Sequence, residues 1–491
     1  MEDRGAAGPA VADAILGLIF LGKEFSVSQS STGRLVILLL FAATRLALIP
    51  AHQRATTLAE INVEYAAEAQ RAARQGLSFY RLHEENRKRQ DPQASVVERS
   101  VEYPPLSILW MRAPVGFLGD VPLSGPVPEA YVRSAVLANK ILLLAVDACG
   151  FALLAAMGAG AAQLAVYTLG GLLLFPVLYD RLDLVLGVLL LVALLLLTRS
   201  RRYWLALVVL ALAINFKMTP LVLVPLFVLG ALPSGALARP VGGQTWKQLG
   251  RNLIVLGLSG AAVFLPFYLL YGPETLSFLG YHAKRGLEIG SVWNTLPIWL
   301  GAIFRLPVSA SLRFGAVEIN SPLAAPFRVL ASIFTAAVIP GLAIALWFLL
   351  ARRPVSAMRR EAVTLAQSDP EFFARCASLC LLTAIVFAPV LSPQYLLWLV
   401  PLAPLWSGRS RWWAWWAFLT ICALSTVHYP FFTGNVLGAL TVEDHMPLLA
   451  RLFWTAPLIA RNLLLIGFTG WFWVDTVRRD TARQEHVEQR T

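Results

Sequence analysis

The stretch LVLGVLLLVALLLLT, from Leu184 to Thr198, decides the fold class because it contains no charged residue. Comparable apolar runs are LVILLLFAATRLALIPA at 35–51 and IVLGLSGAAVFLPFYLLY at 254–271. Runs of this kind approach the roughly 20 apolar residues that cross a bilayer as one helix. The sequence therefore predicts an all-α, polytopic membrane protein.

The composition of the whole chain supports this prediction. The 491 residues are 57% hydrophobic and 14% charged, with a mean hydropathy of +0.64, whereas soluble domains carry about 25% charged residues. The formal charge of +12 comes from basic residues at the ends of apolar runs, which indicates membrane topology and not nucleic-acid binding. The four cysteines show neither metal-ligand nor disulfide spacing, so we expect no metal site.

The positions of the basic residues predict the orientation of the chain. We expect about twelve membrane-spanning helices, at 34–51, 132–158, 161–179, 183–199, 203–216, 218–233, 252–271, 325–351, 376–391, 394–408, 412–430 and 452–475. With this number of spans the basic clusters all fall on one side, which the positive-inside bias identifies as the cytoplasm. These clusters lie at 199–202, 239–251, 352–360, 409–411 and 478–479. Both ends of the chain are then cytoplasmic.

This topology divides the chain into three parts. Residues 1–33 form a cytoplasmic N-terminal segment with an interfacial helix at VADAILGLIFLG, residues 34–475 form the transmembrane domain, and residues 476–491 form a cytoplasmic polar tail. We expect the tail to be disordered from Asp480. The polar segments on the opposite face are the loops 52–131 and 272–324, YDRLD, SPQY and HYPFFTGN. We expect short surface helices in the first loop and the functional site on this non-cytoplasmic face, because functional residues concentrate on loops held by a rigid scaffold.

The first loop opens with LAEINVEYAAEAQ, which places Glu60, Glu64 and Glu68 four residues apart. On a helix these acids form one stripe. A carboxylate beside a membrane cavity is suited to general-base catalysis, because burial raises its pKa towards neutrality. The alternative is the solvated face of a surface helix, in which Arg71 balances Glu68.

A second motif of the same loop is EYPPL, from Glu102 to Leu106. Tyr103 precedes a Pro-Pro pair, which forces an extended conformation and holds Glu102 in a fixed loop geometry. The alternative interpretation is a rigid turn that leads into the next span.

The second large loop contains YHAKRGLEIGSVWN at 281–294, which brings His282, Lys284 and Arg285 together. Basic residues are disfavoured on this side of the membrane. Arginine offers paired donors to phosphate oxygens, and histidine adds a hydrogen bond or a proton. We therefore expect a lipid-linked phosphate to bind here, with ordinary anionic headgroups as the alternative.

Two further charged motifs lie near the same face. In YDRLD, Asp180 and Asp183 flank Arg181 at a tight hairpin, where a structural ion pair is the simpler role. Lys217, in INFKMTPL, either extends to the membrane surface or points into a cavity, where it would complement an anion.

Five motifs, taken in order, carry a resemblance to a known family. They are EYPPL at 102–106, RLDLVLGVLLLVALLLL at 181–197, NFKMTPLVLVPLF at 215–227, HAKRGLEIGSVWN at 282–294 and SPQYLLWLVPL at 392–402. The ordered set resembles the GT-C superfamily of integral-membrane glycosyltransferases. Within it, the chain is most similar to the polyprenyl-phosphate-mannose-dependent branch, glycosyltransferase family 87.

The resemblance implies a GT-C-like fold that transfers a hexose, mannose in type, with inversion. The implied donor is a polyprenyl-phosphate sugar, and the acceptor is a lipid or cell-envelope glycan on the non-cytoplasmic side, with no cofactor and no metal. An acidic residue of the first loop is the implied base. The implied donor-phosphate ligands are His282, Arg285, Lys217 and Lys284. We expect the substrate cavity to include Tyr65, Tyr103, Asp180, Arg181, Asp183, Gln394 and Tyr395.

One position departs from the family pattern. Counting back from Gly76, the family's catalytic aspartate falls on Asn62, and an amide does not act as a base at neutral pH. Either Glu64 or Glu60 has taken over this role, or Glu102 serves, or the chain has lost the chemistry. Of these alternatives we favour Glu64.

Two other functions compete with this interpretation. A transporter or flippase of lipid-linked sugars would also have many spans and buried charges, and an inactive relative would bind a lipid-linked sugar without transferring it. The two large loops on a single side favour the enzyme. We expect a multi-pass protein of a bacterial plasma membrane whose site faces the periplasm. Its partners are membrane lipids, the lipid-linked donor and the acceptor, with no nucleic acid.

Overall fold

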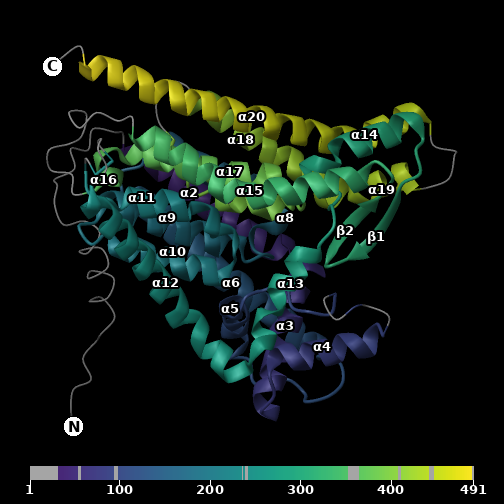
Figure 1. The fold of residues 1–491 in the computed structure, drawn as a ribbon. Helices are drawn as coiled ribbons and strands as arrows, with labels where there is room; N and C mark the ends of the chain where they lie inside the picture. Colours follow the sequence, from purple (N-terminus) through teal and green to yellow (C-terminus); the bar gives the residue numbers. More distant parts are fainter. Residues whose placement is uncertain are drawn as a thin grey trace, which may run out of the picture.

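Helices dominate the structure. The computed structural model describes residues 31–52, 57–92, 95, 98–234, 236–237, 242–351, 364–406, 411–441 and 447–488. The interfacial helix expected at 11–22 lies outside these residues. Within them the helices pack into one body, with a two-stranded hairpin at one edge (Figure 1).

Six helices of the described chain are long and apolar enough to cross a membrane. They are α2 (Ser31–His52), α6 (Glu129–Ala156), α12 (Gly243–Tyr271), α15 (Ala324–Ala351), α17 (Pro370–Phe387) and α20 (Leu448–Glu488). Helix α12 leaves large apolar side chains exposed, among them Leu258, Leu269 and Leu270, which suits contact with lipid. The expected helical, membrane-embedded protein agrees with this architecture.

Shorter elements fill the interior between the long helices. They are α7 (Ala161–Leu173), α8 (Phe175–Leu178), α9 (Asp183–Arg199), α10 (Trp204–Phe216), η1 (Thr219–Leu223), α11 (Val224–Gly230) and α18 (Arg411–Thr426). Helix α9, the apolar run quoted first, is buried along nearly its whole length and packs against α6 and α10. Gly187 permits close packing on the other side, because a Cβ there would lie 2.5 Å from the carbonyl oxygen of Leu397.

Within the segment predicted as a span at 394–408, the described residues 394–406 do not form an α-helix. It consists of the 3-10 helices η5 (Pro393–Trp398) and η6 (Ala403–Leu405), separated by turns. Pro401 and Pro404 lack the backbone N–H that an α-helix needs, and their rings clash with the preceding turn. The prediction was wrong here because apolar composition alone does not distinguish a helix from a buried chain of turns.

A buried polar network ties the N-terminal helices together. Arg45 Nε in α2 lies 2.8 Å from Asp147 Oδ2 in α6, and both side chains are almost completely buried. Tyr167 in α7 and Tyr179 after α8 donate their hydroxyl protons to the same carboxylate, at 2.7 and 2.8 Å. Because the charge of Arg45 is fully paired, it can lie inside an apolar run.

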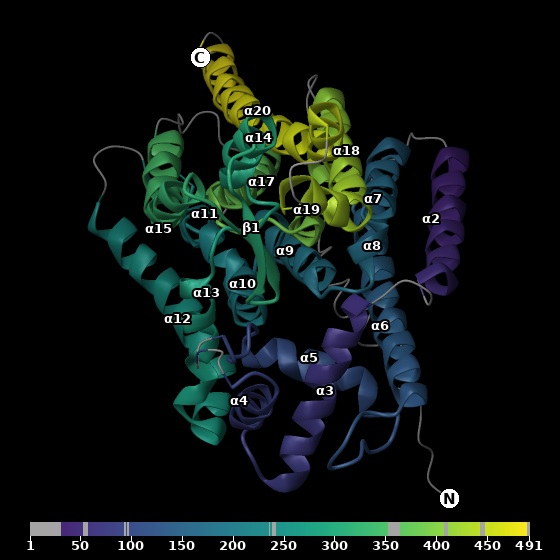
Figure 2. The same cartoon turned by 90° about the vertical axis from the view of Figure 1, so that its right-hand side faces the viewer.

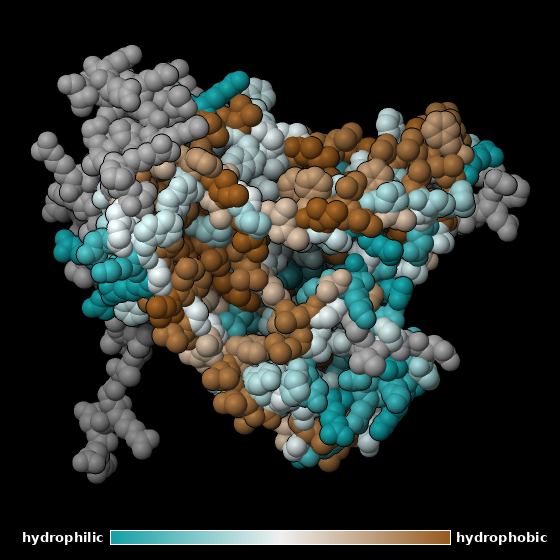
Figure 3. Space-filling view, in the orientation of Figure 1, coloured by the Kyte–Doolittle hydropathy of each residue, from teal (hydrophilic) through white to brown (hydrophobic). Residues whose placement is uncertain are grey.

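The first large loop, at 52–131, carries three helices, where the sequence predicts short surface helices. They are α3 (Thr57–Gln75), α4 (Phe79–Gln90) and α5 (Pro105–Val115). Gly76, with φ of 66°, ends α3 in the left-handed conformation that reverses the chain into α4. Helices α3 and α4 form a hydrophilic projection below the apolar body (Figures 1 and 3), and α5 packs between α3 and the bundle.

The second loop contains a hairpin that the sequence analysis did not predict. Its elements are η2 (Pro273–Leu276), α13 (Ser277–Lys284), η3 (Val292–Asn294), α14 (Thr295–Phe304), β1 (Ser309–Arg313) and β2 (Ala316–Asn320). The strands pair antiparallel, with Arg313 opposite Ala316, across a turn in which Phe314 and Gly315 both have positive φ. Figure 2 shows this hairpin pointing from the helical body towards α3 and α4. The sequence signal for this hairpin was the pair Phe314-Gly315, a two-residue turn ending in glycine between two short runs of alternating apolar and polar residues.

The C-terminal part returns the chain along the bundle. Its shorter elements are α16 (Leu365–Ser368), η7 (Val427–Phe432) and α19 (Thr433–Thr441). Helix α20 continues to Glu488, so the expectation of disorder from Asp480 was wrong. Before that point, Asp475 in α20 binds Arg375 and Arg479 at 2.6 and 2.7 Å, which anchors the helix.

Candidate functional site

A polar cavity of about 360 Å³ lies between the first-loop helices and the second loop. In Figure 3 the surface is hollowed between the apolar body and the hydrophilic projection. The walls come from α3, α4, the 98–104 segment, α13, the hairpin turn and the start of η5. Segments far apart in sequence therefore meet at one place.

Most of the residues singled out from the sequence line this cavity. They are Glu64, Tyr65, Glu102, Tyr103, Arg181, Lys217, His282, Arg285, Gln394 and Tyr395. The structure thus brings the acid stripe, EYPPL, the YHAKRG segment and SPQY to one cavity, which is the convergence that the sidedness argument predicts. Their chemical roles remain predictions.

Asn62 does not line the cavity. Its side chain is buried, and Nδ2 donates a hydrogen bond to the carbonyl oxygen of Asp180 at 3.0 Å. The Asp180 carboxylate is itself fully buried, 3.3 Å from Lys140 Nζ in α6. Both Asn62 and Asp180 therefore join the first loop to the helical body, and the expected cavity position of Asp180 was wrong.

Asp183 also lies behind the cavity wall. Its Oδ1 accepts hydrogen bonds from Lys217 Nζ at 2.6 Å and from the indole nitrogen of Trp398 at 2.7 Å. The Lys217 ammonium in turn lies over the rings of Tyr395 and Trp398, at 5.1 and 5.4 Å from their centroids. Asp183 thus anchors Lys217. We expected Asp183 to line the cavity, and it does not.

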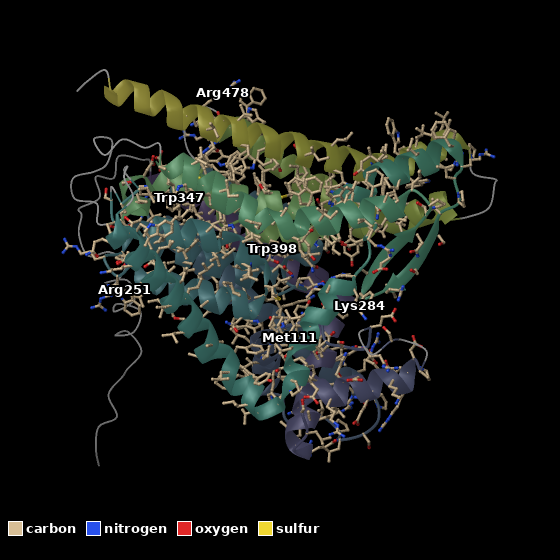
Figure 4. The ribbon with its side chains drawn as sticks, viewed as in Figure 1. Met111, Arg251, Lys284, Trp347, Trp398 and Arg478 are labelled. Atoms are coloured by element: carbon tan, nitrogen blue, oxygen red, sulfur yellow. The ribbon has the colours of Figure 1, made fainter. Side chains whose placement is uncertain are left out.

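Two other predicted residues remain outside the assembled site. Lys284 is exposed and does not line the cavity, and Figure 4 shows it at the periphery, near the end of α13. The backbone of Glu60 belongs to α3, but its side chain lies outside the described part of the structure.

The basic wall of the cavity is organised around Glu102. His282 Nε2 donates to the Glu102 carbonyl oxygen at 2.9 Å, and Arg285 and Arg181 flank the carboxylate. Burial alone would raise the pKa of Glu102, but the two guanidinium groups outweigh it and hold that pKa below its ordinary value. Burial, together with Arg285, lowers the pKa of His282, against the opposing effect of Glu102.

Glu288 also lines the cavity, and the sequence analysis assigned it no role. Burial raises the pKa of its carboxyl group, and the opposing effects of Arg285 and Arg461 do not reverse this shift. Among the described residues, Glu288 Oε2 has no hydrogen-bond partner. The only sequence signal was an acid between apolar residues in GLEIG, three residues after Arg285 of the basic cluster.

The acidic wall contains a contact between a histidine and a carboxylate that was also missed. His83 Nδ1 in α4 lies 2.6 Å from Glu68 Oε2, and Asn86 Nδ2 donates to Glu68 Oε1 at 3.0 Å. Burial opposes ionisation of Glu68, but these hydrogen bonds lower its pKa overall. The expected partner Arg71 instead donates to the carbonyl oxygens of Pro122 and Gly125.

The hairpin turn closes one side of the cavity. Phe314 and Gly315 line it, and the Tyr281 hydroxyl lies 3.3 Å from the place that a Cβ on Gly315 would occupy. Arg313 Nε donates to Glu98 Oε1 at 2.6 Å, which connects the turn to the first loop. This contact fixes the two loops relative to each other.

A second, apolar groove of about 490 Å³ lies among η3, α14, α15, α17 and α20. It is lined by Val292, Trp293, Thr295, Leu296, Trp299, Phe327, Val386, Phe387, Ile459, Leu463 and Ile466. The segment from Glu288 to Trp293 joins the groove to the cavity and runs beside the end of α17. The hydrogen bonds of this contact go from Glu288 N to Pro389 O, from Ser291 Oγ to Ala388 O and from Trp293 Nε1 to Phe387 O, at 3.0–3.1 Å.

The described residues contain no group of three or more His, Cys, Asp or Glu side chains that could hold a metal ion. The fold and the site define a helical, membrane-embedded protein with a charged cavity that adjoins an apolar groove. No protein-family model and no curated protein matches the chain. The function is therefore argued from the geometry of the cavity.

Proposed function

We propose that the protein is an integral-membrane glycosyltransferase that moves a hexose, mannose in type, from a polyprenyl-phosphate donor to a lipid or cell-envelope glycan, with inversion. The fold is proposed to be that of the GT-C superfamily, and the closest relationship that of glycosyltransferase family 87. The observation that carries the proposal is a single cavity lined both by Glu64 and Glu68 and by Arg181, His282 and Arg285.

The proposed reaction needs these two kinds of group. The acceptor oxygen attacks the anomeric carbon, the bond from that carbon to the phosphate oxygen breaks, and a base takes the hydroxyl proton. The leaving phosphate keeps the electron pair, so cations must stabilise its charge. Arg181 and Arg285 offer permanent positive charge and paired N–H donors. Lys217 contributes less, because Asp183 already neutralises it.

The surroundings of the carboxylates favour Glu64 as the base. Glu64 is exposed on the cavity wall. Glu102 lies among Arg285 and Arg181, which hold its pKa low and make it a weaker base. Asn62 is occupied in a structural hydrogen bond. We therefore propose that Glu64, two residues after Asn62 on α3, has the role that the resemblance assigns to an aspartate.

The apolar groove supports a lipid-linked donor. A polyprenyl phosphate has a charged head and a long hydrocarbon tail, so its site must place a cationic surface beside an apolar one. Arg285 faces the cavity, and Trp293 lines the groove only eight residues later. Such a tail would lie on the groove while the phosphate meets the basic wall.

The proposed topology has twelve crossing segments, made of the six long helices and the shorter apolar elements between them. Both termini face the cytoplasm of a bacterial plasma membrane, and the cavity faces the periplasm. The arrangement of charges agrees with this orientation, because Arg251 and Arg478 lie towards the end of the molecule away from Lys284 (Figure 4).

The test is transfer by the purified protein in lipid nanodiscs, with radiolabelled polyprenyl-phosphate mannose and a panel of lipid acceptors. Glu64→Gln is expected to lower kcat at least 100-fold, because an amide takes no proton. Glu85→Gln is the matched control, since Glu85 lies on the exposed face of α4, paired with Arg81. Transfer that survives Glu64→Gln and Glu60→Gln would contradict the assignment of the base to α3.

A flippase for lipid-linked sugars is the second candidate, because the same groove and cavity would hold a lipid-linked sugar during transport. The nanodisc assay distinguishes the two functions when it is paired with sealed vesicles. Movement of the donor across vesicles with no transfer to any acceptor would support the flippase. Donor binding with neither activity would identify an inactive, sugar-binding relative.

A further inference from the structure

The acidic wall contains a small, preorganised cluster formed by Glu68, His83 and Asn86. Both carboxylate oxygens of Glu68 are occupied, by His83 Nδ1 at 2.6 Å and by Asn86 Nδ2 at 3.0 Å. The His83 residue is only 8% exposed, and its ring lies 5.2 Å from the ring of Tyr65. The imidazole is therefore held in one position at the cavity wall.

This arrangement fixes the chemistry of the free edge of the ring. Because Glu68 accepts a hydrogen bond, the proton of neutral His83 lies on Nδ1, and Nε2 carries a lone pair. The described residues give His83 no hydrogen bond other than the one to Glu68. His83 also lines the cavity. Nε2 is thus available to accept a hydrogen bond from a ligand hydroxyl group.

The charge of this wall disfavours an anionic ligand. On this wall the carboxylates Glu64 and Glu68 line the cavity beside the single arginine Arg87. The other two first-loop carboxylates that line it already have basic partners, Arg313 for Glu98 and the arginines of the basic wall for Glu102. An anion placed here would meet like charges, whereas a neutral hydroxyl group would not. The phosphate of a donor is matched by the opposite wall. The acidic wall is therefore left for the neutral substrate.

Two aromatic residues and the geometry of helix α3 indicate the shape of the ligand. The rings of Tyr65 and Tyr103 are nearly perpendicular, with centroids 5.8 Å apart, and both residues line the cavity beside His83. Glu64 and Glu68 are one helical turn apart on α3, about 6 Å along its axis. A ring that binds beside Glu68 would therefore present another hydroxyl group near Glu64.

We propose that Glu68, His83 and Asn86 form the acceptor subsite, which binds a hydroxyl group of a neutral sugar ring and positions a second hydroxyl at Glu64. That the bound sugar is the acceptor substrate rests on the proposed function, whereas the binding of a neutral sugar ring does not. His83 contacts the sugar directly. Glu68 and Asn86 act through His83 as positioning residues.

The test measures binding without catalysis. Methyl α-mannopyranoside, methyl α-glucopyranoside and myo-inositol are titrated into the nanodisc-embedded protein by saturation-transfer NMR, with inorganic phosphate as the anionic competitor. His83→Phe keeps a ring but removes Nε2, and is expected to weaken glycoside binding at least 10-fold. His83→Gln keeps a polar amide and is expected to restore part of it. Glu85→Gln is the matched control and should bind as the parent does.

Four outcomes decide the proposal. Loss of binding in His83→Phe, with a thermal unfolding midpoint like that of the parent, supports the subsite. Glycoside binding that is unchanged in His83→Phe overturns it, and so does a parent protein that binds none of the three probes. Phosphate that displaces the glycoside, and loses this effect in His83→Phe, overturns the assignment to a neutral ligand.

Kinetics then separate the subsite from the proposed function. If both are right, Glu64→Gln keeps glycoside binding and loses transfer, while His83→Phe raises KM for the acceptor more than it lowers kcat. If glycoside binding depends on His83 but no polyprenyl donor supports transfer, the proposed function fails and the sugar subsite stands.

Discussion

At the scale of single residues, Asn62 has a structural role. Its amide donates to the Asp180 carbonyl oxygen from a buried position. A carboxylate could not donate this hydrogen bond, and it would lie near a second buried acid. The amide therefore suits a contact that joins the first loop to the bundle.

Asn62→Asp tests this account, because it replaces the donating amide with a carboxylate of almost the same shape. We expect the variant to be less stable by about 2–4 kcal/mol, since a buried donor is lost and a buried charge is added. Transfer activity should not rise. The measurements are thermal unfolding in detergent and the nanodisc transfer assay, with Asn62→Ala as the control that removes the donor without adding charge. A faster enzyme at unchanged stability would contradict the structural role.

Glu68 supplies a pH-dependent prediction. Its pKa in the folded protein lies below the ordinary value of 4.5, so its ionised form stabilises the fold. The stabilisation is complete above about pH 4.5 and is lost as the pH falls through the lower, folded pKa. Parent and Glu68→Gln should therefore differ by about 1–2 kcal/mol at pH 7. The difference should shrink in acid, as followed by unfolding midpoints between pH 3 and 7. A difference that is constant with pH would exclude an ionised Glu68.

At the scale of elements, the second loop is organised by hydrogen bonds between distant segments. Ile289 N donates to Val317 O at 2.8 Å, and Ile319 N donates to Leu287 O at 3.1 Å, so the segment after the basic cluster pairs with β2. Glu318 Oε1 accepts from Gly286 N at 2.7 Å. The YHAKRG motif is thereby fixed to the hairpin that closes the cavity.

Gly286→Ala should loosen this junction. A Cβ at Gly286 would lie 2.6 Å from a carboxylate oxygen of Glu318, so that side chain must move and its hydrogen bond to the backbone weakens. We expect a loss of about 1–3 kcal/mol in stability and weaker donor binding, because Arg285 precedes the displaced residue. Gly257→Ala is the matched control, since its Cβ would meet nothing within 4 Å. Unfolding midpoints and the donor KM report the effect. Equal behaviour of the two variants would show that the junction tolerates a side chain.

At the scale of the whole molecule, composition and charge placement predicted a helical membrane protein and the convergence of several loops on one cavity. These features follow from local patterns, because apolar length and positive-inside bias act segment by segment. The partners of Glu68, Asp180 and Asp183, which are His83, Lys140 and Lys217, could not be predicted in this way, since each contact joins residues from different elements. The 3-10 helices and turns at 394–406 were also missed, because a buried α-helix and a buried series of turns have equally apolar sequences.

The buried pair of Arg45 and Asp147 is the element of this architecture most open to test, because it connects α2 to α6 and, through Tyr167 and Tyr179, to the approach to the cavity. Arg45→Met alone leaves an unpaired buried carboxylate and is expected to cost about 3–5 kcal/mol. Asp147→Leu alone leaves the buried guanidinium group of Arg45 without its carboxylate partner, and a similar loss of stability is expected. The double variant removes both charges and should recover part of this cost, giving a favourable coupling of about 2 kcal/mol in a double-mutant cycle. Unfolding in detergent supplies all four free energies. Simple additivity would mean that the pair does not hold these helices together, and that apolar packing alone sets the position of α2.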